Sequence, residues 1–151
     1  MRIRLLGVGT RMPSWVRDGF HEYTKRLPRG NRLELVEIPL GDRRKGALAH
    51  EGRRMLDAVG KEDTLIALDE RGERWSTREL AERLEHWRAQ GRDVSLLVGG
   101  PDGLHQSCLE GAHETWSLSP LTFPHYLVRV LVAEQIYRAW SVVTRHPYHR
   151  D

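Results

Sequence analysis

The sequence predicts an α/β fold with a largely parallel sheet. Short apolar runs, rich in leucine and β-branched residues, alternate with segments of helical periodicity along the 151 residues. This alternation is typical of parallel strands joined by helices that cross over the sheet. A second observation concerns the last third of the chain, where two turn-rich segments precede a long and unusually apolar helix. Turns that follow the strands of such a sheet lie where ligands bind.

Five apolar runs bounded by glycine, proline or charged residues are predicted to be mostly buried strands. They are Ile3 to Val8, Leu33 to Ile38, Thr64 to Leu68, Val94 to Val98 and Thr115 to Leu118. The expected helices run from about Pro13 to Arg26, Lys45 to Val59, Thr77 to Ala89 and Pro124 to Val143. Pro13 suits a first helical turn, and Ser76 with Glu79 has the form of a capping box. Gly41 to Gly46 is the loop expected to be most mobile.

The bulk properties indicate one soluble domain, residues 1–151. A chain of this length buries roughly two thirds of its unfolded surface around a single core. It has no run of about 18 uncharged apolar residues, so we expect a cytoplasmic protein that does not contact a membrane. The single cysteine, Cys108, cannot form an internal disulfide and has no evident metal partner, so we expect it to be buried. No metal site is predicted.

The helix expected from Pro124 to Val143 is apolar around most of its circumference. Only Glu134, Arg138 and Ser141 form a narrow polar strip at helical spacing. A single sheet face cannot cover so wide an apolar surface. Either this helix runs through the centre of the fold, or its second face packs against another subunit. In a chain of this size we favour the second alternative, a homodimer.

Two segments ahead of this helix are candidates for binding a small molecule. The strand from Val94 to Val98 runs into Gly99-Gly100-Pro101-Asp102-Gly103, where paired glycines allow close backbone approach. The segment Ser117 to Phe123 exposes peptide groups and offers apolar walls, and Pro124 holds its end extended. These groups could bind the edge of an adenine. Each segment alone is equally compatible with an ordinary strand-to-helix connection, and neither contains a phosphate loop or a nucleophile elbow.

The last helix is followed by the tail His146-Pro147-Tyr148-His149-Arg150. Its His149 and Tyr148 could orient or deprotonate a substrate, and Arg150 could neutralise a phosphate or a developing anion. A frayed terminus is the alternative explanation. On the last helix, Arg138 can form an ion pair with the glutamate one helical turn before it.

Basic residues cluster in two stretches, although the net charge is only +3. The first comprises Arg26, Arg29, Arg32, Arg43, Arg44, Lys45, Arg53 and Arg54, and the second comprises Arg145, His146, His149 and Arg150. Such clusters are compatible with phosphate contacts to a nucleic acid. An ordinary solvated surface explains them equally well.

Taken together, these segments resemble the large-subunit ribosomal RNA methyltransferase H (RlmH) family of the SPOUT superfamily. The resemblance extends from Gly7-Val8-Gly9-Thr10 through Leu68-Asp69 and the glycine turn to the end of the chain. Its most specific elements are Leu121-Thr122-Phe123-Pro124-His125, Glu134-Gln135-Ile136-Tyr137-Arg138-Ala139 and Pro147-Tyr148-His149-Arg150.

This resemblance implies a deep trefoil knot in the C-terminal half, a homodimer, and S-adenosylmethionine as methyl donor. The implied reaction is methylation at N3 of a pseudouridine in large-subunit (23S) ribosomal RNA, with the assembled ribosome as the expected partner. The donor-binding residues that it implies are Leu68, Gly99, Gly100, Leu118, Ser119, Pro120, Leu121, Thr122 and Phe123. For the chemistry, His149 is the candidate base and Tyr148 an orienting group. Arg138 and Arg150 would engage phosphate or the uracil anion, in one pocket made by two chains.

Two other functions are compatible with the sequence. A SPOUT methyltransferase acting on another RNA base, for example in transfer RNA, would keep the donor-binding segments but would have no reason to keep the Pro-Tyr-His-Arg tail. A non-catalytic RNA-binding or ribosome-assembly module would bind RNA without needing S-adenosylmethionine. Binding of the methyl donor separates this last function from the two enzymes.

Overall fold

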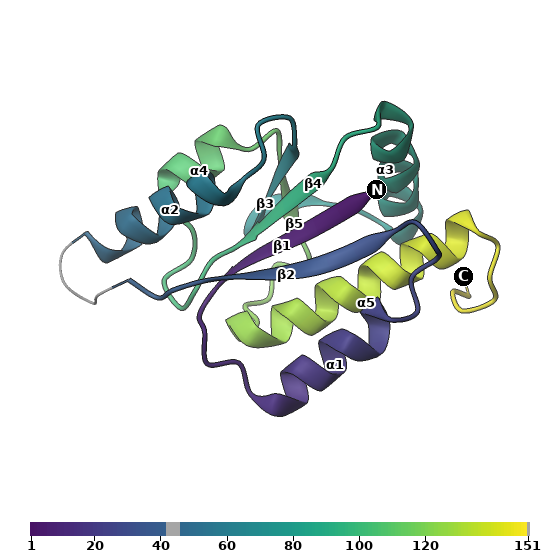
Figure 1. The fold of residues 1–151 in the computed structure, drawn as a ribbon, viewed down its shortest axis with the longest axis horizontal. Coiled ribbons are helices and arrows are strands. Elements are labelled where there is room, and N and C mark those ends of the chain that lie inside the picture. The colour runs from purple at the N-terminus through teal and green to yellow at the C-terminus, as the bar shows by residue number, and fades with distance from the viewer. Residues whose placement is uncertain (42–45, 151) are drawn as a thin grey trace.

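The computed structural model describes residues 1–41 and 46–150, and within them strands and helices alternate along the chain (Figure 1). The strands are β1 (Arg2–Val8), β2 (Arg32–Ile38), β3 (Thr64–Arg74), β4 (Val94–Val98) and β5 (Glu114–Ser117). The helices are α1 (Ser14–Thr24), α2 (Ala47–Ala58), α3 (Thr77–Gln90), α4 (Gln106–Gly111) and α5 (His125–Val143). Between Gly41 and Gly46, the predicted mobile loop with its basic residues Arg43, Arg44 and Lys45 lies outside the described residues.

The strands form one parallel sheet in the order β2-β1-β4-β3-β5. Leu5 of β1 lies opposite Leu35 of β2 and Leu96 of β4. Every residue of β4 is buried, because helices cover the sheet on both sides. Strands in that position have continuous apolar sequences rather than alternating ones, as Val94 to Val98 does. The prediction of a parallel-sheet α/β fold is confirmed.

Two helical layers enclose this sheet (Figure 1). The larger core lies on the face covered by α1, α3 and α5, and it includes Leu96 and Trp140. The smaller core lies on the face covered by α2 and α4, and it includes Leu97 and the fully buried Cys108. Leu96 and Leu97 enter different cores because successive side chains of a strand point to opposite faces.

The long apolar helix α5 lies between other elements of the same chain. It contacts both α1 and α3, and its buried side chains include Val132, Ile136 and Trp140. The first of the two alternatives, a helix inside the fold, therefore accounts for much of its apolar circumference. The homodimer stays a prediction.

Two elements differ from the predicted pattern. The apolar run predicts that β3 ends at Leu68, whereas the strand continues to Arg74 beyond an irregularity between Leu68 and Glu73, where the register with β5 shifts. The second half of the strand is charged, so it lacks the apolar pattern by which a buried strand is predicted. Helix α4 is not predicted, because a helix of six residues is too short to show a helical period.

Candidate functional site

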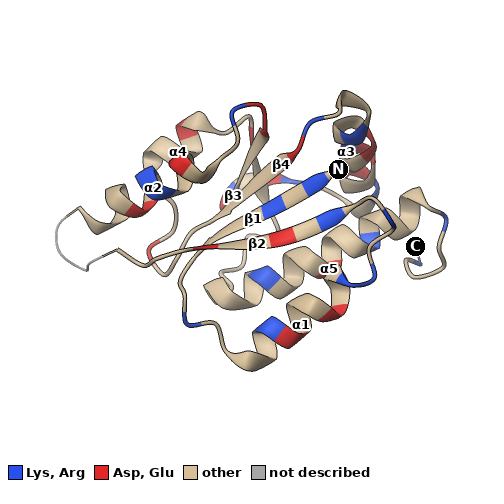
Figure 2. Cartoon of the chain, in the orientation of Figure 1, with Lys and Arg blue, Asp and Glu red and all other residues tan. Residues whose placement is uncertain are grey.

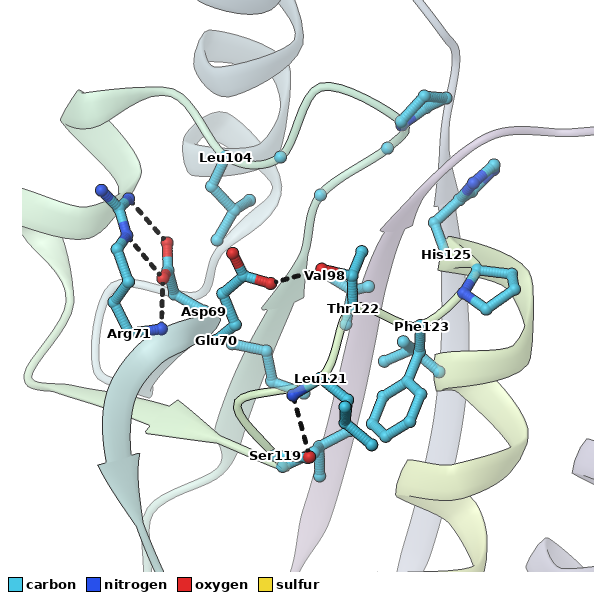
Figure 3. Close-up of a pocket in the computed structure, with 18 of the residues that line it drawn as sticks. Asp69, Glu70, Arg71, Val98, Leu104, Ser119, Leu121, Thr122, Phe123 and His125 are labelled. Atoms are coloured by element: carbon cyan, nitrogen blue, oxygen red, sulfur yellow. Dashed lines mark hydrogen bonds and ion pairs between the residues drawn. The ribbon is translucent and has the colours of Figure 1, made fainter.

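A cavity of about 860 Å³ lies at the carboxyl edge of the sheet, beside the start of α5 (Figure 3). Its wall comes from the middle of β3, where the pairing with β4 has ended, the turn after β4, the segment after β5 and the first turn of α5. Most of the predicted donor-binding residues line it, namely Leu68, Gly99, Gly100, Leu118, Ser119, Leu121, Thr122 and Phe123. Pro120 is exposed and is not part of the wall. Parallel strands bring these segments together because all their carboxyl ends meet at one edge.

The turn after β4 is too tight for side chains at its first glycine. The N–H of Gly103 donates to the carbonyl of Gly100 at 3.0 Å, and Gly103 has a φ of 78°. A Cβ on Gly99 would lie 2.3 Å from the carbonyl carbon of Gly103, which no side chain can tolerate. Glycine at position 99 is therefore what allows this turn, which lines the cavity, to close so tightly.

The segment after β5 is fixed by hydrogen bonds at both of its ends. The hydroxyl of Ser119 accepts the backbone N–H of Leu121 at 3.0 Å, which closes a local turn. The hydroxyl of Thr122 donates to Oε2 of Glu70 on β3 at 2.8 Å. Leu121 is 69% exposed although it is apolar, so it offers a surface for a ligand at the mouth of the cavity.

The irregular part of β3 supplies charged groups to the same wall. Arg71 donates from Nε and Nη2 to the two carboxylate oxygens of Asp69, each at 3.1 Å (Figure 3). These hydrogen bonds lower the pKa of Asp69. The carbonyl of Glu70 accepts the hydroxyl of Ser117 at 3.0 Å. Sequence reasoning misses Glu70 and Arg71 as wall residues, since a charged run after a buried strand resembles an ordinary solvated loop.

A buried arginine on α5 supports the neighbouring loop. The side chain of Arg129 is fully buried, donates to the carbonyl of Gly9 at 2.9 Å and forms an ion pair with Glu37 at 2.9 Å. The Tyr126 hydroxyl accepts the backbone N–H of Arg11 at 3.1 Å. Together these two α5 side chains hold the loop after β1 against the start of α5. Sequence reasoning does not identify Arg129, because nothing in its local sequence distinguishes it from a surface arginine.

His125, the first residue of α5, lines the cavity. Its ring lies 4.2 Å from the ring of Tyr126, and α5 has no side-chain hydrogen bond at its N-terminal cap. Burial and the positive charge of Arg129 lower the pKa of His125. The imidazole is therefore mostly uncharged at pH 7.

The predicted catalytic residues lie together at the other end of α5. Arg138 forms an ion pair with Glu134 at 2.6 Å and donates from Nη1 to Nδ1 of His149 at 3.1 Å, since a guanidinium can only donate. The Tyr148 hydroxyl donates to the same Glu134 carboxylate at 3.0 Å. Burial and this hydrogen bond raise the pKa of Tyr148 to about 12. Arg150 is exposed.

The tail and the cavity are far apart within one chain. At 1.5 Å per residue, about 20 Å of helix separates His125 from Arg138. Figure 1 shows the C-terminus beside the end of α5, away from the segments that line the cavity. Within one chain, the predicted donor-binding residues form one cluster and the predicted catalytic residues form another. The two clusters lie at opposite ends of α5.

Charges of both signs are interspersed on the surface. Figure 2 shows both basic and acidic residues on each of α1, β2 and α3. In the first predicted basic stretch, Arg26 pairs with Glu22 and Arg32 pairs with Glu34. In the part of the chain that the structure describes, no group of three metal-ligating side chains could hold a metal ion, and no helix is long and apolar enough to cross a membrane.

Comparisons with known proteins agree with this architecture. A family model described as "Predicted SPOUT methyltransferase" matches residues 1–149. The chain is 61% identical to the "Ribosomal RNA large subunit methyltransferase H" of Alkalilimnicola ehrlichii, over 99% of each chain. A protein from Bordetella pertussis described as "Probable Methyltransferase" shares the fold at a TM-score of 0.58 and 18% identity, with 92% of this chain and 96% of that chain covered. A protein from Haemophilus influenzae described as a "probable methylase family protein" shares the fold at a TM-score of 0.56 and 17% identity, with 99% of this chain and 70% of that chain covered.

Proposed function

Since the chain belongs to the SPOUT methyltransferase family, we propose that it methylates large-subunit ribosomal RNA with S-adenosylmethionine as the methyl donor. The observation that carries this proposal is the cavity whose wall brings together eight of the nine predicted donor-binding residues, from three separate segments. The 61% identity to a ribosomal RNA large subunit methyltransferase H over nearly the whole chain supports the RNA substrate. The finer parts of the proposal are N3 of a pseudouridine as the target, the assembled ribosome as the partner, a cytoplasmic location and a knotted C-terminal half.

The residues of the cavity suit this donor. The glycine turn lines the cavity with residues that have no side chains, namely Gly99, Gly100 and Gly103, so its backbone groups can approach a ligand closely. Leu118, Leu121 and Phe123 offer apolar surface for an adenine, and the peptide groups around them offer hydrogen bonds to its edge. The volume of about 860 Å³ exceeds that of a ligand of this size, so it leaves room for the target base.

When bound, S-adenosylmethionine supplies an electrophilic methyl group, which the uracil N3 accepts as the N3–H proton leaves. The chain must therefore hold the base in line and accept that proton. With its pKa raised to about 12, Tyr148 stays protonated and orients the substrate. His149 is the proposed proton acceptor, through the Nδ1 that now accepts from Arg138. Arg138 and Arg150 would then bind phosphate or the uracil anion.

The proposed active site contains two chains. Because about 20 Å of helix lies between His125 and Arg138, the tail of one protomer has to serve the cavity of its partner in a homodimer. Each protomer would contribute one cavity and one tail, so a twofold dimer contains two equal sites.

Mixing two inactive variants tests this arrangement. The Gly99→Ala variant has a defective cavity and a normal tail. A chain truncated after Arg145 has a normal cavity and no tail. After subunit exchange about half of the dimers are mixed, each with one intact site, so about a quarter of the wild-type methylation should return. No recovery, with exchange verified by native mass spectrometry, would contradict the shared site. Wild-type turnover of the truncated chain alone would remove His149 from the mechanism.

The target is tested in cells. We expect mass spectrometry of 23S ribosomal RNA from a deletion strain to show loss of one methylpseudouridine, and the wild-type gene to restore it. An unchanged methylpseudouridine together with the loss of a methyl group elsewhere would identify a SPOUT enzyme with another target. If calorimetry detected no binding of S-adenosylmethionine, the enzyme function itself would be refuted and an RNA-binding role would take its place.

A further inference from the structure

The wall of the cavity carries an uneven set of charges. Its ionisable side chains belong to Asp69, Glu70 and Arg71 on β3, Asp102 in the glycine turn and His125 on α5. Asp69 and Arg71 neutralise each other through two side-chain hydrogen bonds of 3.1 Å. His125 is mostly uncharged at pH 7, because burial and the charge of Arg129 lower its pKa. The carboxylates of Glu70 and Asp102 therefore give this wall a net negative charge.

Of these two carboxylates, that of Glu70 is held in a defined position. Its Oε2 accepts the hydroxyl of Thr122 at 2.8 Å, and the Glu70 carbonyl accepts the Ser117 hydroxyl at 3.0 Å. Figure 3 shows the carboxylate between Asp69 and Thr122, directed toward the segment after β5. The negative charge is thus fixed beside the segment that we propose to bind the donor, on a side chain that also remains exposed to water.

We propose that Glu70 makes the cavity select the positively charged methyl donor over the neutral product that remains after transfer. This inference rests on the proposed function. S-adenosylmethionine carries a sulfonium charge, whereas S-adenosylhomocysteine has a neutral thioether in its place, and the two molecules otherwise present the same groups to the wall. A fixed carboxylate therefore binds the donor more tightly than the product and favours product release.

Three substitutions separate charge from hydrogen bonding. Glu70→Gln removes the charge but keeps an oxygen that can accept from Thr122, whereas Thr122→Val removes the hydrogen bond and keeps the charge. Glu62→Gln is the matched control, because Glu62 is exposed and precedes the amino end of β3, at the opposite edge of the sheet. Calorimetry would measure the dissociation constants of S-adenosylmethionine, S-adenosylhomocysteine and sinefungin, whose amine restores a positive charge near the sulfonium position.

We expect Glu70→Gln to weaken binding of S-adenosylmethionine and sinefungin about two- to fivefold, the range for one solvent-exposed charge interaction, and to leave S-adenosylhomocysteine nearly unchanged. Thr122→Val should weaken all three ligands by a similar factor, and Glu62→Gln should change none. In the wild type, the preference for the donor over the product should also decrease as the salt concentration rises.

The ratio of the dissociation constants of product and donor tests the proposed role of Glu70. If Glu70→Gln lost the same affinity for all three ligands, Glu70 would act only by holding Thr122, and the charge would have no selective role. A wild type that binds the product as tightly as the donor at low salt would refute selection by charge altogether. The salt series in the wild type gives this answer even if a variant fails to fold. Failure of the wild type to bind any of the three ligands would instead refute the proposed function.

Discussion

Replacing Arg129 with methionine should destabilise the protein by about 2–6 kcal/mol. The guanidinium donates to the carbonyls of Gly9 at 2.9 Å and Val8 at 3.3 Å, and to Glu37 at 2.9 Å. Methionine retains much of the apolar contact but no donor. Each buried carbonyl left without a partner costs about 1–3 kcal/mol. The side chain of Glu37 is 34% exposed and regains water, so it adds little to the sum.

Urea unfolding at pH 7, followed by tryptophan fluorescence, measures this difference. Glu37→Gln is the comparison variant: its amide oxygen still accepts from Arg129, but it removes the counter-charge of a buried guanidinium. It should cost less than Arg129→Met, because the hydrogen bonds from Arg129 to the carbonyls of Val8 and Gly9 remain. The loop after β1 should also lose protection from hydrogen exchange in Arg129→Met, because Gly9 is held by that side chain. A loss of stability below about 1 kcal/mol, or an equal loss in both variants, would refute the assignment of Arg129 as the buried support of this loop.

Three further predictions concern the cavity, the tail and a helix cap. Gly99→Ala should abolish detectable binding of S-adenosylmethionine in calorimetry while circular dichroism stays native, because the added Cβ would lie 2.3 Å from Gly103. The absorbance of tyrosinate should show Tyr148 ionising near pH 12, and a Tyr148→Phe difference titration identifies it. Because the pKa of this group is raised in the folded state, its contribution to stability is complete below about pH 10 and is lost as the pH rises toward 12. Ser76→Ala removes the capping hydrogen bond to the N–H of Glu79 and should lower the unfolding free energy by about 1 kcal/mol.

The fold was predictable where the sequence pattern is local. The run from Val94 to Val98 predicts a strand buried on both faces, and that is what β4 is. Ser76 and Glu79 predict a capping box, which starts α3 with both of its hydrogen bonds. The end of β3 could not be predicted from a local pattern. The second half of this strand pairs with β5 after a change of register and has few apolar residues of its own.

The site was predictable only in part, for a related reason. Gly99 and Thr122 belong to motifs that the sequence displays, and both line the cavity. Glu70 and Arg129 have no such signal, since their roles depend on Thr122 and Glu37, which are 52 and 92 residues away in the chain. One arginine among 24 basic residues cannot be recognised as buried until the fold supplies its partners.

The direction of α5 constrains how two chains can share a site. Its start lies at the carboxyl edge of the sheet, where the cavity is, and its end leads into the tail after about 28 Å of helix. If each tail serves the cavity of the partner, a twofold axis must bring the end of one α5 to the start of the other, so the two helices run antiparallel. Leu127 and Leu131 are half-buried and lie one turn apart on one face of α5, and they are the side chains that such packing would cover. Aspartate at either position should therefore abolish methylation and dimerisation together, while donor binding by the monomer persists because the cavity wall comes from one chain.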